Sequence, residues 1–418
     1  MFAKNDVFPK NIYRIINEAL AAKSKGLFKL HPQRCYTLPY AHVMVIDDQP
    51  EAKMDQAINL ADDLQNALSK YGIFQGVTVR PFPLRVEVDR KDAQPVHLSK
   101  WWGRLRTMST NDGGFSPAVI YRGSNEVLMD VAFSNQANTH VGIFGTTGSG
   151  KTVIAISTLL SLAYRNDPGK LGIVICDKTG KNYTALAGLP HLMMPIAVTL
   201  EECEAAIHAV RVEMLRRQSE GDNSGHRIIL VVDEFSTLLD QSESITADIM
   251  DIAQIGRNQN INLVVCAQKM TVSVPTVISN NVGCRFTGRI ADPADAKRTG
   301  GQQSQAHRLP AGRGAFEFNN GIVSARAQGL LAGDVDQMLG DIAQRWYGMQ
   351  SGRLDAGVKP VVENSQPVAS KKADPAFLEA CRAAGVSTAG AVRRVYQDMF
   401  GKQLAHNDAV NVLAVVAQ

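Results

Sequence analysis

Residues 145–152 read GTTGSGKT, and most of the chemistry that the sequence implies depends on this octapeptide. It matches the phosphate-binding pattern GxxxxGK[ST] at every specified position. The apolar run HVGIF (residues 140–144) precedes it, and the helix-forming run VIAIS (153–157) follows it. A glycine-rich loop between a buried strand and a helix N-terminus presents backbone N–H groups and the positive end of the helix dipole to an anion. The sequence therefore predicts a site for nucleotide phosphates.

The residue types inside the loop suit a nucleotide bound together with Mg²⁺. Lys151 is placed to reach the β- and γ-phosphates, and the hydroxyl of Thr152 is placed to ligate the metal ion. The glycines allow the backbone to close around the phosphate oxygens. The predicted nucleotide-binding residues are Gly145, Thr146, Thr147, Gly148, Ser149, Gly150, Lys151 and Thr152.

A second motif, RIILVVDEF (227–235), ends a buried run in two acids. Asp233 is expected to hold the Mg²⁺ shell, and Glu234 to polarise the attacking water. Switch GTPases often position that water with glutamine, so the Asp–Glu pair favours an ATPase with ATP and Mg²⁺ as its cofactors. The alternative is a simple acidic helix cap after a strand. Its occurrence downstream of a phosphate loop favours the catalytic interpretation.

A third buried run, INLVVCAQ (261–268), ends in the polar Gln268. A side chain at that strand end could sense the γ-phosphate, although strands often end in a polar residue. The preceding stretch AQIGRNQN (253–260) carries Arg257 at an expected helix end. Such an arginine could reach the nucleotide of a neighbouring subunit, and an ordinary surface arginine is an equal alternative.

The pattern around these motifs is that of an α/β domain. Five apolar runs, separated by helical stretches, are continuous rather than alternating, which is typical of parallel strands covered on both faces. A hairpin is expected to follow, turning at Asn319–Asn320–Gly321. The expected strands are residues 140–145, 171–176, 227–233, 261–268 and 284–290, and the longest expected helices are 153–165 and 200–218.

The remaining sequence suggests four regions. Residues 1–136 are predicted to form an α+β module, with helices at 11–30 and 48–72 and a strand at 41–46. Residues 137–350 form the predicted ATPase motor. A Ser-, Pro-, Gly- and Lys-rich stretch, 351–374, is the predicted linker, and 375–418 is a small helical module. Within the first region, WWGRLR (101–106) is interpreted as a core tryptophan pair covered by arginine stems, with nucleic-acid binding as the alternative.

Composition limits the class of protein. With 45% hydrophobic and 20% charged residues, the 418-residue chain can bury a large core, and a net charge of +4 is too weak to imply nucleic acid by itself. The six cysteines show no CxxC spacing and are expected to be buried thiols in a reducing compartment. No signal peptide and no apolar stretch of about 18 residues is found, so we expect a cytoplasmic protein without a membrane span.

Taken together, these motifs resemble the FtsK/SpoIIIE family of ring-shaped DNA translocases, within the wider HerA–FtsK class. The Thr-Thr-Gly-Ser interior of the phosphate loop is the family's form of that loop, and Gly-x-Pro-His-Leu at 188–192 is similar to a family run. The resemblance extends from about residue 50 to about residue 335. The further stretches that carry it are residues 186–217, 231–239, 252–268, 278–298 and 326–329.

This resemblance implies a RecA-like P-loop motor that hydrolyses ATP, a homohexamer with ATP at subunit interfaces, and double-stranded DNA in a central pore. It implies nucleotide binding by Lys151 and Thr152, Mg²⁺ binding by Asp233, and a base role for Glu234. Gln268 would be the sensor and Arg257 the first candidate for an arginine acting in trans, ahead of Arg285 and Lys297. DNA contacts would be phosphate contacts independent of sequence, and the candidates are Lys178, Lys181 and Lys269, each of which could instead be a solvated charge.

Two stretches depart from the family pattern. KMTVSVPT (269–276) stands where the family usually has Arg-Pro. The C-terminal residues 387–416 only partly resemble the family's winged-helix module; they offer Arg393–Arg394 but no clear wing hairpin, and a helical bundle that binds a protein partner is an equal alternative. The absence of membrane spans suggests a plasmid, phage or integrated element. A secretion or assembly ATPase is the main alternative function, and the Asp233–Glu234 pair disfavours a scaffold without turnover.

Overall fold

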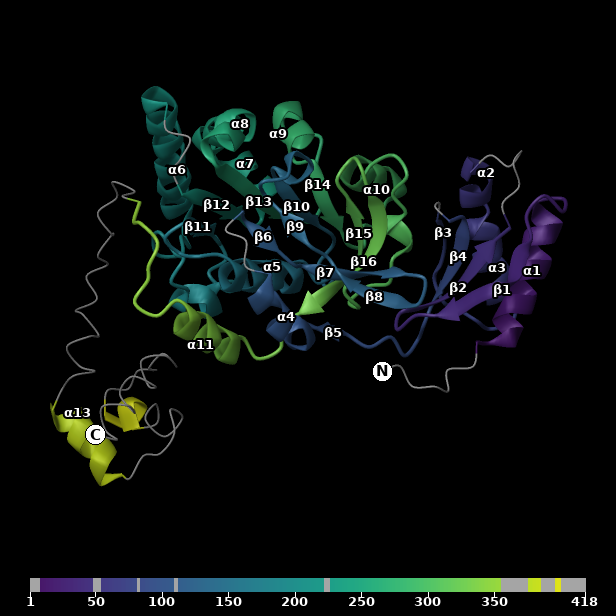
Figure 1. Ribbon diagram of the computed structural model, residues 1–418, viewed down its shortest axis with the longest axis horizontal. Helices are drawn as coiled ribbons and strands as arrows, with labels where there is room; N and C mark the ends of the chain where they lie inside the picture. Colours follow the sequence, from purple (N-terminus) through teal and green to yellow (C-terminus); the bar gives the residue numbers. More distant parts are fainter. Residues whose placement is uncertain are drawn as a thin grey trace. The chain divides into compact units, whose positions relative to one another are not determined.

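The computed structural model describes residues 8–47, 54–80, 83–108, 112–221, 226–354, 375–384 and 395–399. The chain divides into two compact units, Met1–Gly357 and Val358–Gln418. The first unit holds a large mixed sheet and a smaller N-terminal sheet, and both are described below (Figure 1).

The core of the first unit is a ten-stranded sheet whose longest path runs β11-β12-β13-β10-β14-β15-β16-β7-β8. Its first five strands are mutually parallel, which confirms the predicted α/β fold with a mostly parallel sheet. Almost every residue in these strands is buried, because helices cover both faces. The parallel strands are β10 (Val141–Phe144), β11 (Leu171–Cys176), β12 (Arg227–Val232), β13 (Ile261–Ala267) and β14 (Cys284–Thr287).

Antiparallel strands extend this sheet beyond β14. The expected hairpin is present as β15 (Ala315–Asn319) and β16 (Ser324–Leu331), and the side chain of Asn320 closes its turn by accepting hydrogen bonds from the N–H groups of Ile322 and Val323 at 3.2 and 2.9 Å. The strands β7 (Ala118–Arg122), β8 (Asn125–Leu128) and β5 (Val96–His97) then join β16 and its neighbours.

The pairing of β5 and β7 differs from the predicted division of the chain into modules. Residues 96–128 were assigned to the N-terminal module, yet β5 and β7 pair directly with β16 of the large sheet. The predicted boundaries at 136/137, 350/351 and 374/375 remain predictions. The sheet membership means that the smaller N-terminal fold is built from the residues before β5.

Helices cover the two faces of the large sheet in separate groups (Figure 1). One apolar core lies beneath α5, α4 and α11, and a second lies beneath α6, α7, α8 and α9. The long helix α6 begins with a capping box, in which Thr199 and Glu202 satisfy each other's backbone N–H groups. The bounds are α4 (Trp102–Thr107), α5 (Lys151–Arg165), α6 (Leu200–Glu220), α7 (Phe235–Gln241), α8 (Glu243–Ile255), α9 (Thr276–Asn281), α10 (Pro293–Gly300) and α11 (Val335–Arg345).

Trp101, which ends η1 (Leu98–Trp101), and Trp102, which begins α4, pack against the first of these cores. Trp102 stacks on Tyr164 of α5 with ring centroids 4.1 Å apart, and its indole N–H donates to Asp341 at 2.8 Å. Arg104 lies over the ring of Trp101. The interpretation of this segment as a tryptophan pair packed against the core and covered by basic stems is confirmed.

The N-terminal sheet has the order β1-β2-β4-β3 and is antiparallel throughout. Side chains alternate across it: Val86 and Val88 pack beneath the helices, whereas Glu87 and Asp89 face the other way and are also buried. The strands are β1 (Leu30–Thr37), β2 (Ala41–Ile46), β3 (Val77–Arg80) and β4 (Arg85–Asp89), and the helices are α1 (Lys10–Lys23), α2 (Met54–Asn59) and α3 (Ala61–Ser69).

Both predicted N-terminal helices are present with changed limits. The first ends at Lys23, because Lys25 and Gly26 adopt positive φ and the chain turns into β1. The second lies partly outside the described residues and is divided at Leu60 into α2 and α3.

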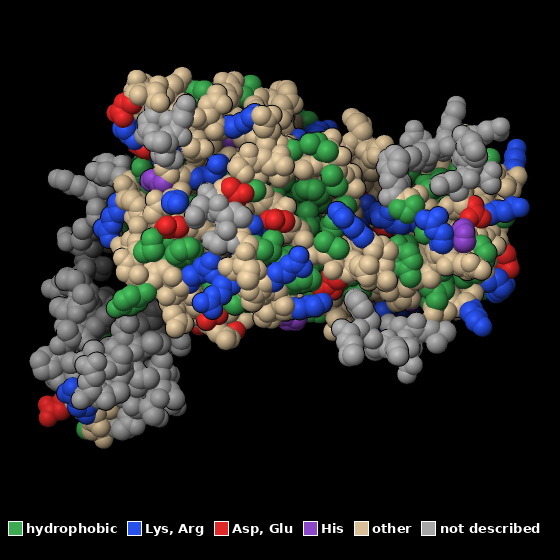
Figure 2. All heavy atoms as spheres, in the orientation of Figure 1, with side chains coloured by type: hydrophobic (Ala, Val, Ile, Leu, Met, Phe, Trp, Pro, Cys, Tyr) green, Lys and Arg blue, Asp and Glu red, His purple; other side chains and the backbone are tan. Residues whose placement is uncertain are grey.

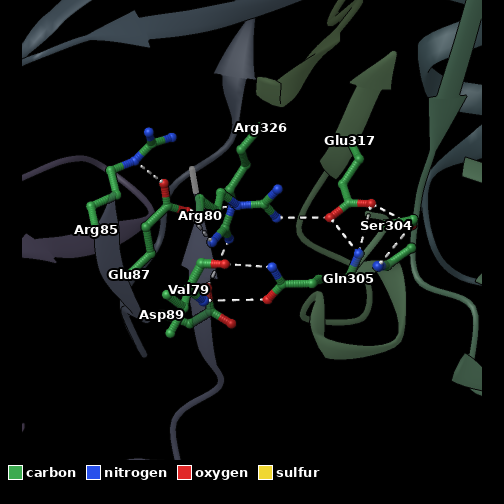
Figure 3. A network of polar contacts seen from close by, with 10 residues as sticks. Val79, Arg80, Arg85, Glu87, Asp89, Ser304, Gln305, Glu317 and Arg326 are labelled. Atoms are coloured by element: carbon green, nitrogen blue, oxygen red, sulfur yellow. Dashed lines mark hydrogen bonds and ion pairs between the residues drawn. The ribbon is translucent and has the colours of Figure 1, made fainter. Parts of the chain in front are cut away.

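A buried ionic network joins the N-terminal sheet to the large sheet (Figure 3). Arg326 of β16 pairs with Glu87 at 3.2 Å and with Asp89 at 2.8 Å, and the three side chains are nearly inaccessible to solvent. Arg80 of β3 pairs with Glu317 of β15 at 3.0 Å. Burial alone would raise the pKa of Glu87, but the surrounding arginines Arg85, Arg80 and Arg326 lower it to about 2.

Short elements complete the fold. The sheet pair β6–β9 lies beside α5, and 3-10 turns connect longer elements. Their bounds are η1 (Leu98–Trp101), β6 (Gly114–Phe115), β9 (Val131–Ala132), η2 (Gln136–Asn138), η3 (Thr184–Gly188), η4 (Gly256–Gln259) and η5 (Ala306–Arg308).

Of the second unit, the structure describes α13 (Pro375–Ala383) and a helical turn at 395–399, where Phe377 and Tyr396 make an edge-to-face contact. Arg393 and Arg394 lie outside the described residues. All six cysteines are free thiols and five are buried, as expected. In the described part of the chain no helix is long and apolar enough to cross a membrane.

Candidate nucleotide-binding site

The octapeptide 145–152 connects β10 to α5, as the sequence predicts. Gly148 and Gly150 adopt φ values of 79° and 99°, which suit glycine, and Gly150 is the residue that precedes the helix. The loop is anchored at both flanks. The N–H of Gly145 donates to the carbonyl of Gln268 at 3.0 Å, and the N–H of Thr146 donates to the carbonyl of Arg289 at 2.8 Å. The loop conformation is therefore held by the ends of β13 and β14.

Two polar side chains of the loop, those of Lys151 and Ser149, are available to an anion. The ammonium of Lys151 donates to the carbonyl of Gly145 at 2.8 Å, which folds the lysine back across the loop. The hydroxyl of Ser149 is buried without a hydrogen-bond partner in the described structure. A buried hydroxyl and a lysine held only by a carbonyl are the groups that an anion in the loop would satisfy.

A cavity of about 700 Å³ opens above this loop. Its volume suits a nucleotide, since small-molecule sites usually measure about 300–1,000 Å³. The phosphate loop and the residues that follow β12 line it, together with β16 and connecting segments. The lining residues are Ala93, Pro95, Thr147, Gly148, Gly150, Lys151, Thr152, Val153, Asn182, Asp233, Glu234, Gly312, Arg313, Gly314, Gln328, Gly329 and Leu331.

The two acids predicted from RIILVVDEF line this cavity at the end of β12. Asp233 is almost fully buried. Its pKa is raised above the ordinary value, because burial disfavours the carboxylate more than the hydrogen bond from Asn182 favours it. The carboxylate of Asp233 and the hydroxyl of Thr152 are oxygen donors of the kind that Mg²⁺ prefers, so these residues would hold the metal ion.

Glu234 has a strained backbone. Its φ and ψ are 47° and 39°, in the left-handed region that residues other than glycine rarely adopt, and it immediately precedes α7. Strain of this kind is concentrated at functional sites, where the surrounding structure maintains it. Glu234 lines the cavity from the turn that follows Asp233.

The structure adds one residue that the sequence analysis missed. The side-chain amide of Asn182 donates to Asp233 Oδ2 at 2.8 Å, and Asn182 lines the cavity. Its loop is folded around the buried carboxylate of Asp177, which accepts hydrogen bonds from the N–H groups of Thr179, Asn182 and Tyr183 at 3.2, 2.8 and 3.1 Å. The available signal was an aspartate at the end of β11 followed by Thr-Gly-x-Asn, which is a local turn pattern.

We expect Asn182→Ala to raise the Mg²⁺ concentration that activity requires. Without the amide, Asp233 loses the hydrogen bond that orients it, and removal of such supporting bonds typically costs about 10–100-fold in metal affinity or activity. The half-maximal Mg²⁺ concentration for ATP hydrolysis should rise by about tenfold or more, with a smaller change at saturating Mg²⁺. Thr184→Ala, two residues further on and exposed, is the matched control. An unchanged Mg²⁺ requirement in Asn182→Ala would remove Asn182 from this role.

The other predicted site residues lie outside the cavity lining. Gln268 touches the loop through its main-chain carbonyl, and its side chain is exposed. Arg257 is exposed in η4. Arg285 donates to the carbonyls of Val282, Thr299 and Ser279 at 2.8, 3.0 and 2.6 Å, so its guanidinium braces the fold. Lys297 lies in α10 and does not line the cavity.

The three predicted DNA lysines have different surroundings. Lys178 contacts Gln241, Lys269 forms an ion pair with Asp295, and Lys181 is exposed. Lys178 and Lys181 occupy the same loop as Asn182. This loop therefore connects two basic side chains to the carboxylate that is the predicted metal ligand.

A glycine-rich loop between a parallel strand and a helix, two acids at the end of a neighbouring strand, and a nucleotide-sized cavity above them define a P-loop ATPase. The FtsK/SpoIIIE family model matches residues 116–330, which is just over half of the chain. The chain belongs to the FtsK/SpoIIIE family.

Curated relatives support this assignment. The chain is 27% identical to the DNA translocase FtsK of Helicobacter pylori (strain J99) over 323 residues, covering 70% of this chain and 37% of the relative. It is 25% identical to the DNA translocase SftA of Bacillus subtilis (strain 168) over 369 residues, covering 80% of this chain and 37% of the relative. The chain thus spans well under half the length of these proteins.

Solved structures agree on the fold. ATPases 2 and 3 of Thermomonospora curvata EccC, in complex with a signal sequence peptide, superpose with a TM-score of 0.52 at 19% identity, covering 59% of this chain and 49% of that one. ATPases 2 and 3 of Geobacillus thermodenitrificans EssC give a TM-score of 0.52 at 17% identity, covering 59% and 51%. At these identities the likeness concerns the fold alone.

Proposed function

We propose that this protein is an ATP-driven double-stranded DNA translocase that acts as a homohexameric ring and moves DNA through a central pore. The observation that carries the proposal is the combination of a candidate nucleotide site with membership of the FtsK/SpoIIIE family. The cavity holds a phosphate loop and the Asp233–Glu234 pair, and the curated relatives are DNA translocases.

In this proposal the residues of the cavity bind ATP and direct water to it. The loop N–H groups and Lys151 hold the phosphates, and Asn182 keeps Asp233 oriented. Glu234 accepts a proton from the attacking water. Mg²⁺, when bound by Thr152 and Asp233, would neutralise charge on the phosphate oxygens. Gln268 senses the γ-phosphate, and Arg257 contributes to the nucleotide site of the adjacent subunit.

The DNA contacts are proposed to be contacts to phosphates, made by Lys178, Lys181 and Lys269 in the pore. Because Lys178 and Lys181 share a loop with Asn182, a change around Asp233 can alter their position. The proposed location is the cytoplasm. The proposed biological setting is a plasmid, phage or integrated element, and the C-terminal module is proposed to bind a protein partner.

Stimulation of ATP hydrolysis by duplex DNA tests this proposal. We expect the rate to rise with duplex length at low salt, and to fall steeply between about 50 and 200 mM salt as phosphate contacts are screened. Single-stranded DNA of the same length is the control for duplex preference. Hydrolysis that no duplex stimulates, at any length or salt concentration, would rule out a DNA motor.

The second candidate is an ATPase that drives protein secretion or assembly. It is favoured by the structural likeness to EccC and EssC, which shows the fold alone. The same assay separates the two functions. A secretion or assembly ATPase would hydrolyse ATP without stimulation by DNA and would require a polypeptide partner.

A further inference from the structure

A small hollow lies at the junction between the N-terminal sheet and the large sheet, on the side of Asp89. Its volume is about 280 Å³. Residues 74–76 and 89–91 form one side, and the other side comes from the segments around β14 and β15. Five of its lining residues are basic, namely Arg90, Lys91, Arg289, Arg308 and Arg313, and we call this set the basic hollow. Figure 2 shows Lys and Arg side chains at this junction.

The charge of the basic hollow is only partly neutralised. Arg90 pairs with Asp92 at 2.6 Å and Arg308 with Asp62 at 2.7 Å, and both carboxylates are exposed. The single acid in the lining, Asp89, is already engaged by Arg326 at 2.8 Å.

The other three cations of the hollow are Lys91, Arg289 and Arg313. In the part of the chain that the structure describes, no carboxylate forms an ion pair with Lys91, Arg289 or Arg313. Arg289 donates to the carbonyl of Leu309 at 2.9 Å, and Arg313 donates to the carbonyl of Arg90. Lys91 is exposed. Among the described residues, the positive charge of these three side chains is therefore not balanced by an ion pair.

The basic hollow is adjacent to the nucleotide cavity. Arg313 lines both. The carbonyl of Arg289 holds the phosphate-loop residue Thr146 at 2.8 Å. A ligand in the hollow would thus contact residues that also support the nucleotide site.

We propose that the basic hollow binds backbone phosphates of duplex DNA, as a contact separate from the predicted pore lysines. This inference rests on the proposed function, because it names a further contact with the same partner. Arginine guanidinium groups present paired donors that match phosphate oxygens, and phosphate contacts of this kind hold a duplex without reading its sequence.

The shape of the hollow favours DNA phosphates over a second free nucleotide. Its volume is below the range of about 300–1,000 Å³ that is usual for small-molecule sites. Five cations from three separate segments exceed what one phosphate group requires, whereas consecutive phosphates of a duplex would meet several of them. The adjacent 700 Å³ cavity already suits the nucleotide.

The salt dependence of DNA binding tests the proposal. Binding of a labelled duplex of random sequence is measured by fluorescence anisotropy between about 50 and 200 mM salt, with a non-hydrolysable ATP analogue present. The test variant is Lys91→Gln/Arg308→Gln, which changes two cations outside the nucleotide cavity lining. Each phosphate contact contributes about 0.9 to the slope of log Kd against log salt, so the slope should fall by about 1 to 2.

Two further variants make the result specific. Lys29→Glu changes an exposed charge at the opposite end of the N-terminal sheet and should keep the wild-type slope. Arg308→Lys, which retains the charge, should restore most of the contribution of Arg308. Binding of the ATP analogue should be the same in all variants, which reports an intact motor.

The outcomes separate this inference from the proposed function. A wild-type slope and affinity in the double variant would overturn the basic hollow and leave the translocase proposal in place. If inorganic phosphate at millimolar concentration bound the hollow and left duplex binding unchanged, the hollow would not be a DNA contact, and the proposal would likewise be overturned. No duplex binding by the wild-type protein at any salt concentration would contradict both proposals.

Discussion

Glu234→Gln should bind ATP with wild-type affinity and hydrolyse it about 10²–10⁴-fold more slowly. The expected loss is the range in which a positioned general base contributes. Glutamine retains the size of the side chain and its ability to accept a hydrogen bond, but it cannot take the proton of the attacking water. The measurements are nucleotide binding at equilibrium and steady-state phosphate release.

The geometry around Glu234 makes this prediction stronger than the sequence motif does. Asp233 and Glu234 are consecutive, yet Asp233 is almost fully buried and is held by Asn182, whereas Glu234 is less buried and itself adopts the left-handed conformation. Two adjacent carboxylates thus have different surroundings, which is how a protein assigns them different roles. A functional role also accounts for the left-handed backbone, because glycine would adopt this conformation without strain and the position is nevertheless occupied by glutamate.

The control for this prediction is Asp240→Asn, which makes the analogous change from carboxylate to amide on an exposed residue of α7. It should leave both binding and hydrolysis unchanged. Turnover by Glu234→Gln within twofold or threefold of the wild type would remove Glu234 from the base role. Loss of ATP binding in the same variant would instead indicate that Glu234 supports the cavity wall.

The parallel sheet and the nucleotide site could be predicted because their signals are local. Each buried parallel strand is a continuous apolar run, and the phosphate loop and the Asp–Glu pair directly follow such runs. The carboxyl ends of parallel strands lie at the same edge of the sheet. The recognised strands therefore predict that Lys151 and Asp233 lie near each other.

What could not be predicted depends on contacts between distant segments. The short strands β7 and β8 carry no information on their partner, because strand preferences describe a half-buried surface and not a neighbour. Asn182 has its role only because the fold brings its loop within 2.8 Å of Asp233. Similarly, nothing in RVEVD (85–89) indicates what covers its polar side chains, and in the structure Arg326 of β16 pairs with Glu87 and Asp89.

Arg326→Met should destabilise the first unit by about 3–5 kcal/mol, the usual cost of leaving buried charges without their partner. Arg326 is inaccessible to solvent, bridges Glu87 and Asp89, and lies over the ring of Tyr40 at 4.4 Å. Methionine can fill part of the volume but supplies no donor. Urea unfolding at neutral pH measures the loss. Asp89→Asn in the same chain should recover part of it, because Arg326 is the ion-pair partner of Asp89, whereas Glu87 keeps its ion pairs with Arg80 and Arg85.

The matched control is Arg14→Met, which breaks the exposed Arg14–Glu18 ion pair on α1. Exposed pairs of this kind are worth about 0–1 kcal/mol, so this variant should unfold close to the wild type. If Arg326→Met were no less stable than Arg14→Met, the ion pairs of the buried network would add nothing to the free energy of unfolding beyond the packing of the side chains.

The pH dependence of stability gives an independent check on the same network. The pKa of Glu87 is about 2 in the folded state, below the ordinary value of 4.5, so its contribution is present above about pH 4.5 and is lost as the pH falls towards 2. Removal of Arg326 takes away one of the charges that lower this pKa, so less of the contribution of Glu87 to stability should remain to be lost on acidification.

Arg326→Met should also weaken ATP binding, because β16 carries both Arg326 and the cavity-lining residues Gln328 and Gly329.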